Sequence, residues 1–140
     1  MELTIKILEG FNDVDFGTSK EKFIEKMGEA AQTEIISDDE DPITTQLLEY
    51  PELKTSFFFE GKNGKFYLNS CDTNNENAML FGKKIFMLNK KEVISLFNNM
   101  GYDKYETKTE EWGEMRMTFE DSMIDLYYDG NELISVIWGY

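Results

Sequence analysis

Carboxylates are almost the only side chains in this sequence that could do acid–base or covalent chemistry. The chain has 28 acidic residues, one cysteine and no histidine. Without histidine, the commonest general base near neutral pH is missing, and so is Ser–His or Cys–His activation of a nucleophile. The single thiol, Cys71, is followed by Asp72, and a neighbouring carboxylate disfavours the reactive thiolate. We therefore expect no enzyme, and a small structural role for Cys71.

Two runs of oxygen-bearing side chains could in principle hold a hard cation such as Ca²⁺. The first comprises residues 38–41, which are all acidic. The second, residues 72–77, begins like an EF-hand loop, but Asn77 stands where the sharp turn needs glycine and Lys83 where the bidentate glutamate belongs. No dinucleotide fingerprint or phosphate-binding glycine loop occurs. We expect neither a metal nor a cofactor, and interpret the first run as a solvated loop.

Two acidic loops are instead candidates for binding a partner protein. Tryptophan is a frequent energetic anchor of interfaces, and acids steer a basic partner toward it. An alternative is that the tryptophan folds back onto the edge of the core. The predicted partner-binding residues are Asp38, Asp39, Glu40 and Asp41 in one loop, and Glu110, Glu111 and Trp112 in the other.

Charge narrows the kind of partner. The net charge is −14, and Arg116 is the only arginine. Nucleic acid is held by clustered Lys and Arg that displace counterions, so we expect no nucleic-acid partner and favour a protein with a basic surface. The sequence shows neither a signal-peptide pattern nor an apolar run of about 20 residues that could span a bilayer. With one cysteine and no possible internal disulfide, we expect a cytoplasmic protein without a membrane partner.

The elements that must position these loops begin with two similar helix signals. Thr18–Ser19 with Glu21, and Asn89 with Glu92, have the spacing of a helix N-cap and its capping-box acid. Each signal precedes apolar residues that recur at helical spacing. These are Phe23, Ile24, Met27 and Ala31 in the first helix, and Val93, Ile94, Phe97 and Met100 in the second.

Each predicted helix is followed by four strand-like segments, the first two of which are separated by an acidic loop. In the first half they are residues 34–36, 44–50, 54–60 and 65–69, with the loop at 37–42. In the second half they are residues 102–106, 115–119, 123–128 and 132–138, with the loop at 107–113. The polar run 72–77 is the predicted linker, and residues 78–81 and 85–88 form a predicted connecting hairpin.

The sequence thus predicts one α+β domain, residues 1–140, whose halves (about 1–72 and 78–140) are two tandem helix-plus-four-strand repeats. Short links between strands imply a broad antiparallel sheet with the helices packed on one face. The best match between the halves sets residues 58–61 against 127–130, an aromatic pair before an acid–glycine turn. A single irregular domain without true repeats is the alternative. Phe57 and Phe59 must face away from Phe58, so some aromatic rings lie on the side without helices.

This layout resembles that of the β-lactamase inhibitor protein and related small bacterial repeat domains. The resemblance rests on element order, on residues 16–19 before the first helix, and on the turns at Gly61 and Gly130. It implies binding of another protein through an exposed sheet face or loops. We therefore expect a non-enzymatic binding module, such as an acidic immunity or inhibitor protein that neutralises a basic toxin or enzyme. A self-associating structural domain and a carboxylate- or metal-dependent enzyme are the alternatives.

Overall fold

The computed structural model describes residues 1–36 and 42–140. It has mixed helix and strand content and consists mostly of sheet, with 48% strand and 18% helix. The described residues form two sheets, two α-helices and two short 3-10 helices. The helical elements are α1 (Lys20–Met27), α2 (Lys90–Asn99), η1 (Pro51–Leu53) and η2 (Ile85–Met87).

The larger sheet has eight strands in the order β10-β11-β12-β13-β7-β6-β5-β4, and every neighbouring pair is antiparallel. The predicted broad antiparallel sheet is thus confirmed. In its middle, β7 pairs with β13, which joins the two halves of the chain. Its strands are β4 (Gln32–Ile36), β5 (Thr44–Tyr50), β6 (Thr55–Lys62), β7 (Lys65–Thr73), β10 (Tyr105–Thr109), β11 (Met115–Phe119), β12 (Ile124–Asp129) and β13 (Glu132–Gly139).

The second sheet was not predicted. It is built from β3 (Val14–Asp15), β2 (Gly10–Phe11), β1 (Thr4–Lys6), β8 (Met79–Leu80) and β9 (Lys83–Lys84), in that order. Here β1 runs parallel to β8. The paired residues are about 75 positions apart in the sequence, and no local pattern indicates such a pairing. The prediction that residues 85–88 form the second strand of a hairpin is wrong. Phe81 and Gly82 both adopt positive φ, so a two-residue turn leads directly into β9, and residues 85–87 form η2.

Both helices begin where their capping residues indicate. In α2 the predicted capping box is present: the Glu92 amide donates to Asn89 Oδ1 (2.9 Å) and the Asn89 amide donates to Glu92 Oε1 (3.0 Å). In α1 the cap is Ser19, whose Oγ accepts from the Lys22 amide at 3.3 Å. Thr18 donates its hydroxyl instead to the Asp15 carbonyl, so the predicted Thr18–Glu21 capping pair is wrong by one residue.

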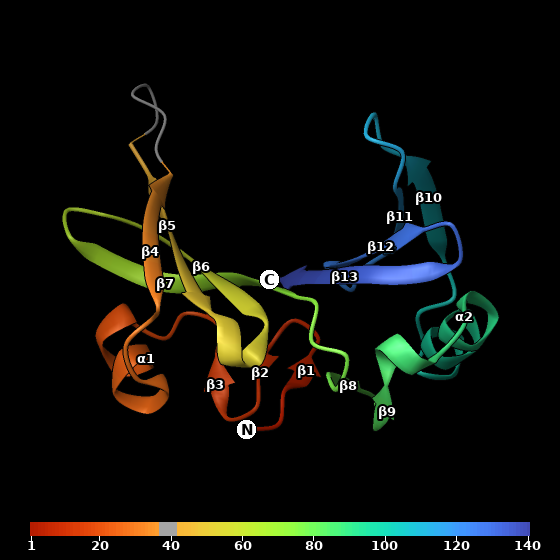
Figure 1. Cartoon of the computed structure of the whole chain (residues 1–140), viewed down its shortest axis with the longest axis horizontal. Helices are drawn as coiled ribbons and strands as arrows, with labels where there is room; N and C mark the ends of the chain where they lie inside the picture. The colour runs from red at the N-terminus through yellow and green to blue at the C-terminus, as the bar shows by residue number, and fades with distance from the viewer. Residues whose placement is uncertain (37–41) are drawn as a thin grey trace.

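The two helices cover the same face of the eight-stranded sheet (Figure 1). Phe23 of α1 packs edge-on against Phe57 and Phe59, with ring centroids 5.0 Å apart in both pairs. Phe97 of α2 stacks on Phe119, with centroids 3.9 Å apart. All of these rings are fully buried and belong to one hydrophobic core. Phe58, in contrast, points to the other face, as alternation predicts.

The smaller sheet closes the same core between the helices. The Trp138 indole Nε1 donates to the Gly10 carbonyl at 2.8 Å, and both residues are buried. This bond links the middle of the large sheet to β2. It also satisfies a polar indole group that burial would otherwise leave unpaired.

The two halves share element order and one irregularity. Each has a helix followed by four antiparallel strands. The pairing of β6 with β7 shifts register between Phe58 and Phe59, and the pairing of β12 with β13 shifts between Tyr127 and Tyr128. These are the positions that the sequence comparison aligned. Element order and matching bulges do not establish a duplication, which stays a prediction.

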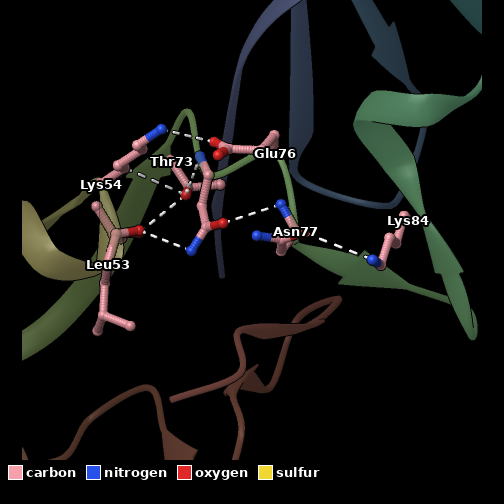
Figure 2. A network of polar contacts seen from close by, with 8 residues as sticks. Leu53, Lys54, Thr73, Glu76, Asn77 and Lys84 are labelled. Atoms are coloured by element: carbon pink, nitrogen blue, oxygen red, sulfur yellow. Dashed lines mark hydrogen bonds and ion pairs between the residues drawn. The ribbon is translucent and has the colours of Figure 1, made fainter.

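The predicted linker, residues 72–77, is ordered by a polar network (Figure 2). Strand β7 extends through Thr73, further than predicted, because the chain continues to pair with β6 and β13. The side-chain amide of Asn75 then donates to the Leu53 carbonyl at 2.9 Å, and Lys54 Nζ forms an ion pair with Glu76 at 2.8 Å. The polar side chains of this run therefore fix it to the chain around η1 in the first half.

Candidate protein-binding surface

Of the two predicted acidic loops, the structure describes only the one that contains Trp112. Asp38, Asp39, Glu40 and Asp41 lie outside the described residues. The strands that flank them, β4 and β5, are at one edge, and the strands that flank Trp112, β10 and β11, are at the other (Figure 1). With about 4.8 Å between strands, eight strands separate these edges by roughly 30 Å. The two pairs of edge strands therefore lie far apart in the sheet.

The second loop is shorter than predicted, because residues 107–109 belong to β10. The remaining turn is closed by a hydrogen bond from the Glu110 amide to the Glu114 carbonyl (2.8 Å). Trp112 is 65% exposed, so the alternative in which it folds onto the core edge does not hold. Glu111 is also exposed. Glu110 has a side chain only 12% exposed, and its carboxylate lies 3.6 Å from Arg116 Nε. Glu110 thus meets a cation within the chain.

In the part of the chain that the structure describes, no helix or second sheet covers the face of the eight-stranded sheet opposite the helices, which we call the open face. Figure 1 shows both helices and the smaller sheet on the same side, while the outer strands at both ends rise away from them. The sheet backbone is therefore bent, with the open face on its concave side, and we call this concave side the trough.

Residue pairing defines a row of side chains across the trough. It crosses all eight strands in the order Gln32, Glu49, Ser56, Asp72, Ile137, Asp125, Thr118 and Glu106. The next row toward the β6–β7 turn contains Leu47 and Phe58, which are partly buried. The middle of the open face thus combines apolar side chains with acids.

Charge is distributed unevenly between the two sides of the molecule. Acids on the open face outnumber bases: Glu34, Glu49, Glu60, Asp72, Glu106, Asp125, Asp129 and Glu132, against Lys62, Lys65, Lys108 and Arg116. Many of the lysines belong to the helices and the smaller sheet on the other side: Lys20, Lys22, Lys26, Lys83, Lys84, Lys90 and Lys91. The open face therefore faces solvent with the more negative potential.

The acids of the open face differ in how they are compensated. Asp125 accepts a hydrogen bond from Thr118 Oγ1 at 2.5 Å and interacts electrostatically with Arg116. Among the residues that the structure describes, Glu49 and Asp72 have neither an ion pair nor a side-chain hydrogen bond. Lys54 lies beside both, but its ammonium group is paired with Glu76 (Figure 2). Glu49 and Asp72 are therefore partly buried acids that no cation of the described residues pairs with.

These two acids line a hollow of about 330 Å³ in the trough, together with Ser56, Asn74 and Ile134 among others. Burial raises the pKa of the Asp72 carboxyl above its ordinary value, because desolvation penalises the charged form. In the sequence, Asp72 stands out only as the neighbour of Cys71 and as the first residue of the predicted linker and of the calcium-loop-like run 72–77. The signal that could have found it is alternation, which sends Asp72 to the face opposite the buried Cys71 and Thr73.

A larger groove of about 580 Å³ lies at the β6–β7 hairpin and is lined by Tyr67, Tyr140 and Asn69 among others. Its rim carries both signs of charge, since Glu60, Lys62 and Lys65 all contribute to it. The groove therefore shows no charge preference for a ligand.

The geometry supports little covalent chemistry at Cys71. Its side chain is fully buried, and desolvation followed by the charge of Asp72 raises the pKa of the thiol well above its ordinary value. The thiolate needed for nucleophilic attack is thus strongly disfavoured. Within residues 1–36 and 42–140, no group of three Cys, Asp or Glu side chains is arranged to hold a metal ion.

Over the same residues, no helix combines the length and apolar composition that crossing a bilayer requires. Comparison of the chain with protein-family models, with curated proteins and with solved structures found no match. The resemblance in layout to the β-lactamase inhibitor protein therefore stays an expectation.

Proposed function

We propose that this chain is a non-enzymatic protein-binding module that uses the open face of its eight-stranded sheet to bind a protein with a basic surface. The observation that supports this most is the combination of an uncovered trough, acids and half-buried apolar residues on one side of the molecule. Interfaces need apolar area for affinity, and complementary charge for specificity and rapid association.

The charge of the open face also favours a different protein over a second copy of this chain. Two open faces brought together would place like-charged rows against each other, which costs free energy. A cationic toxin or enzyme would meet complementary charge instead. The proposal is accordingly an immunity or inhibitor protein of the cytoplasm that covers a basic functional surface, with Glu111 and Trp112 at the rim of the contact.

To test the proposal, we would measure how fast this chain associates with purified basic proteins that are encoded beside its gene. The unaltered chain is compared with the triple variant Glu34→Gln/Glu60→Gln/Glu106→Gln. These three acids are exposed and lie on the open face. Charges at the rim of an interface act mainly on the association rate. For a true partner, we expect the association rate of the triple variant to be roughly several-fold lower than that of the unaltered chain. This is the size of effect that removing charges from the rim of an interface has in other complexes. The rate should also depend less steeply on salt concentration.

The matched control, Glu2→Gln/Glu9→Gln/Glu25→Gln, removes the same charge from exposed positions outside the open face. It should leave the association rate nearly unchanged. Equal effects of the two triple variants, or binding indifferent to salt, would contradict the proposal. Sedimentation that showed a stable homodimer with the open face buried would also count against it.

We also propose that the two halves are repeats of one ancestral unit. This is supported by the shared order of one helix and four strands and by bulges at corresponding places, Phe58–Phe59 and Tyr127–Tyr128. A homologue in which the two halves share clear sequence identity would test it.

A further inference from the structure

We propose that the hollow between Glu49 and Asp72 receives an arginine side chain of the partner, inserted at the part of the open face where β5 and β7 end and β6 begins. This inference rests on the proposed function and deepens it by naming the chemical group recognised. The hollow lies on an unpartnered sheet face, and its occupant is selected by charge complementarity.

The register of the sheet sets the geometry of the hollow. Glu49 pairs with Ser56, and Ser56 pairs with Asp72, so the two acids stand on strands β5 and β7 on either side of the Ser56 hydroxyl. Two strand spacings put their backbones about 10 Å apart. Side chains that lean inward from this spacing can contact one planar group between them.

The surroundings of the hollow favour occupation by a cation from outside. Lys54 could have neutralised these acids, but its Nζ lies 2.8 Å from Glu76 Oε2. Asp72 is partly buried in the middle of the sheet, next to Ile137, and carries its charge away from bulk water. A cation supplied by the partner would restore the interactions that Asp72 lost with water.

Arginine fits this site better than lysine does. A guanidinium group offers five N–H donors in a plane, so it can bond to two carboxylates and a hydroxyl together, whereas an ammonium group acts as a compact point charge. The aliphatic part of an arginine side chain can also pack on apolar residues. Pro51 and Ile134, which line the hollow, provide such surface.

The test uses blocked tripeptides, acetyl-Gly-Arg-Gly-amide and acetyl-Gly-Lys-Gly-amide, titrated into the ¹⁵N-labelled full chain at low salt. We expect the arginine peptide to shift the amide signals of Ser56, Asp72 and Ile137 in a saturable way. Binding should weaken about tenfold in Asp72→Asn and several-fold in Glu49→Gln, because each loses one charge-assisted contact. Glu25→Gln, on the outer side of α1, is the control and should bind as the unaltered chain does.

Three outcomes would overturn the inference. The first is shifts spread evenly over all acidic surfaces, the second is equal response to arginine and lysine peptides, and the third is saturable Mg²⁺ or Ca²⁺ binding at the same amides that excludes the peptide. Circular dichroism of each variant confirms that it is folded. If the peptides fail while a basic protein still responds to the Glu34, Glu60 and Glu106 substitutions, the arginine site is wrong and the proposed function stands.

Discussion

The face of the sheet on which a residue lies determines its environment and its role in this protein. On β7, Cys71 is fully buried beneath the helices, while the next residue, Asp72, points into the trough. Neighbours in sequence thus experience opposite environments. Desolvation raises the pKa of both side chains. For Cys71 this keeps the thiol protonated and unreactive in the core. For Asp72 it leaves a charge that the fold does not compensate.

Asp72→Asn should therefore stabilise the free protein at neutral pH. A carboxyl whose pKa is raised by folding contributes stability that is complete below its unfolded pKa, about 3.9, and is lost as the pH rises through the folded value. Asparagine has no such dependence. We expect the variant's advantage in free energy of unfolding, measured by urea denaturation, to be small at pH 3 and to grow toward pH 7.

Glu2→Gln is the control for this prediction, since Glu2 is exposed near the chain start. Its effect on stability should change much less between pH 3 and pH 7. A variant Asp72→Asn that is less stable than the unaltered chain at pH 7 would show that the carboxylate is compensated. Greater stability combined with weaker peptide binding would mark Asp72 as a residue kept for recognition at the expense of stability.

At the scale of elements, the sequence predicted boundaries most reliably where one side chain forms a hydrogen bond with a nearby backbone group. Asn89 and Glu92 predicted the start of α2 correctly, because a capping box depends only on residues three positions apart. The strands of the large sheet were also found, with boundaries off by a few residues, since alternation and turns are local. The short strands β1, β2, β3 and β9 were missed, because a pattern of two or three residues carries little periodicity. Strand β8 lies within the first arm of the predicted hairpin, residues 78–81.

The α2 cap can be tested directly. Asn89→Ala removes the acceptor for the Glu92 amide and should lower the free energy of unfolding by about 1 kcal/mol, measured by urea denaturation. Lys91→Ala, at an exposed position of the same helix, serves as the control and should change it by less than about 0.5 kcal/mol. Equal losses in both variants would show that the cap contributes nothing specific.

At the scale of the whole molecule, the two sheets share one core, and Trp138 is the residue that bonds them together. Its ring is completely buried in β13, and its indole N–H reaches the carbonyl of Gly10 in β2, 128 positions away. Because that carbonyl is buried, losing its donor leaves an unsatisfied polar group. The trough depends on this contact, since the small sheet supports the middle of the large one from below (Figure 1).

Trp138→Phe should therefore lower the free energy of unfolding by about 1–3 kcal/mol from the unsatisfied carbonyl, with a further loss from the smaller ring. Trp112→Phe is the matched control: the side chain is 65% exposed, and its replacement should cost less than about 0.5 kcal/mol. The free energies of unfolding of both variants are measured by thermal or urea denaturation and compared with that of the unaltered chain. A Trp138→Phe protein as stable as the control would mean that the bond between the sheets is not structurally important.

The candidate surface could be predicted only in part. Glu111 and Trp112 are exposed as the sequence suggested, because a glycine-containing turn between two strands must lie at the surface. The pairing of Glu110 with Arg116 could not be predicted, because Arg116 stands on the next strand and the contact depends on the hairpin register. Glu49 and Asp72 were missed, since they are 23 positions apart and become neighbours only through Ser56.

Composition and local pattern alone determined the acidic character of this protein, its two capped helices and its antiparallel strands, because each depends on residue type or on spacings of a few residues. Only the tertiary structure decided that β7 pairs with β13, that a second sheet joins residues 4–15 to residues 79–84, and that uncompensated acids meet in one trough. Those outcomes depend on pairing between distant segments. Such pairing is selected by burial of one common core, and no local spacing encodes it.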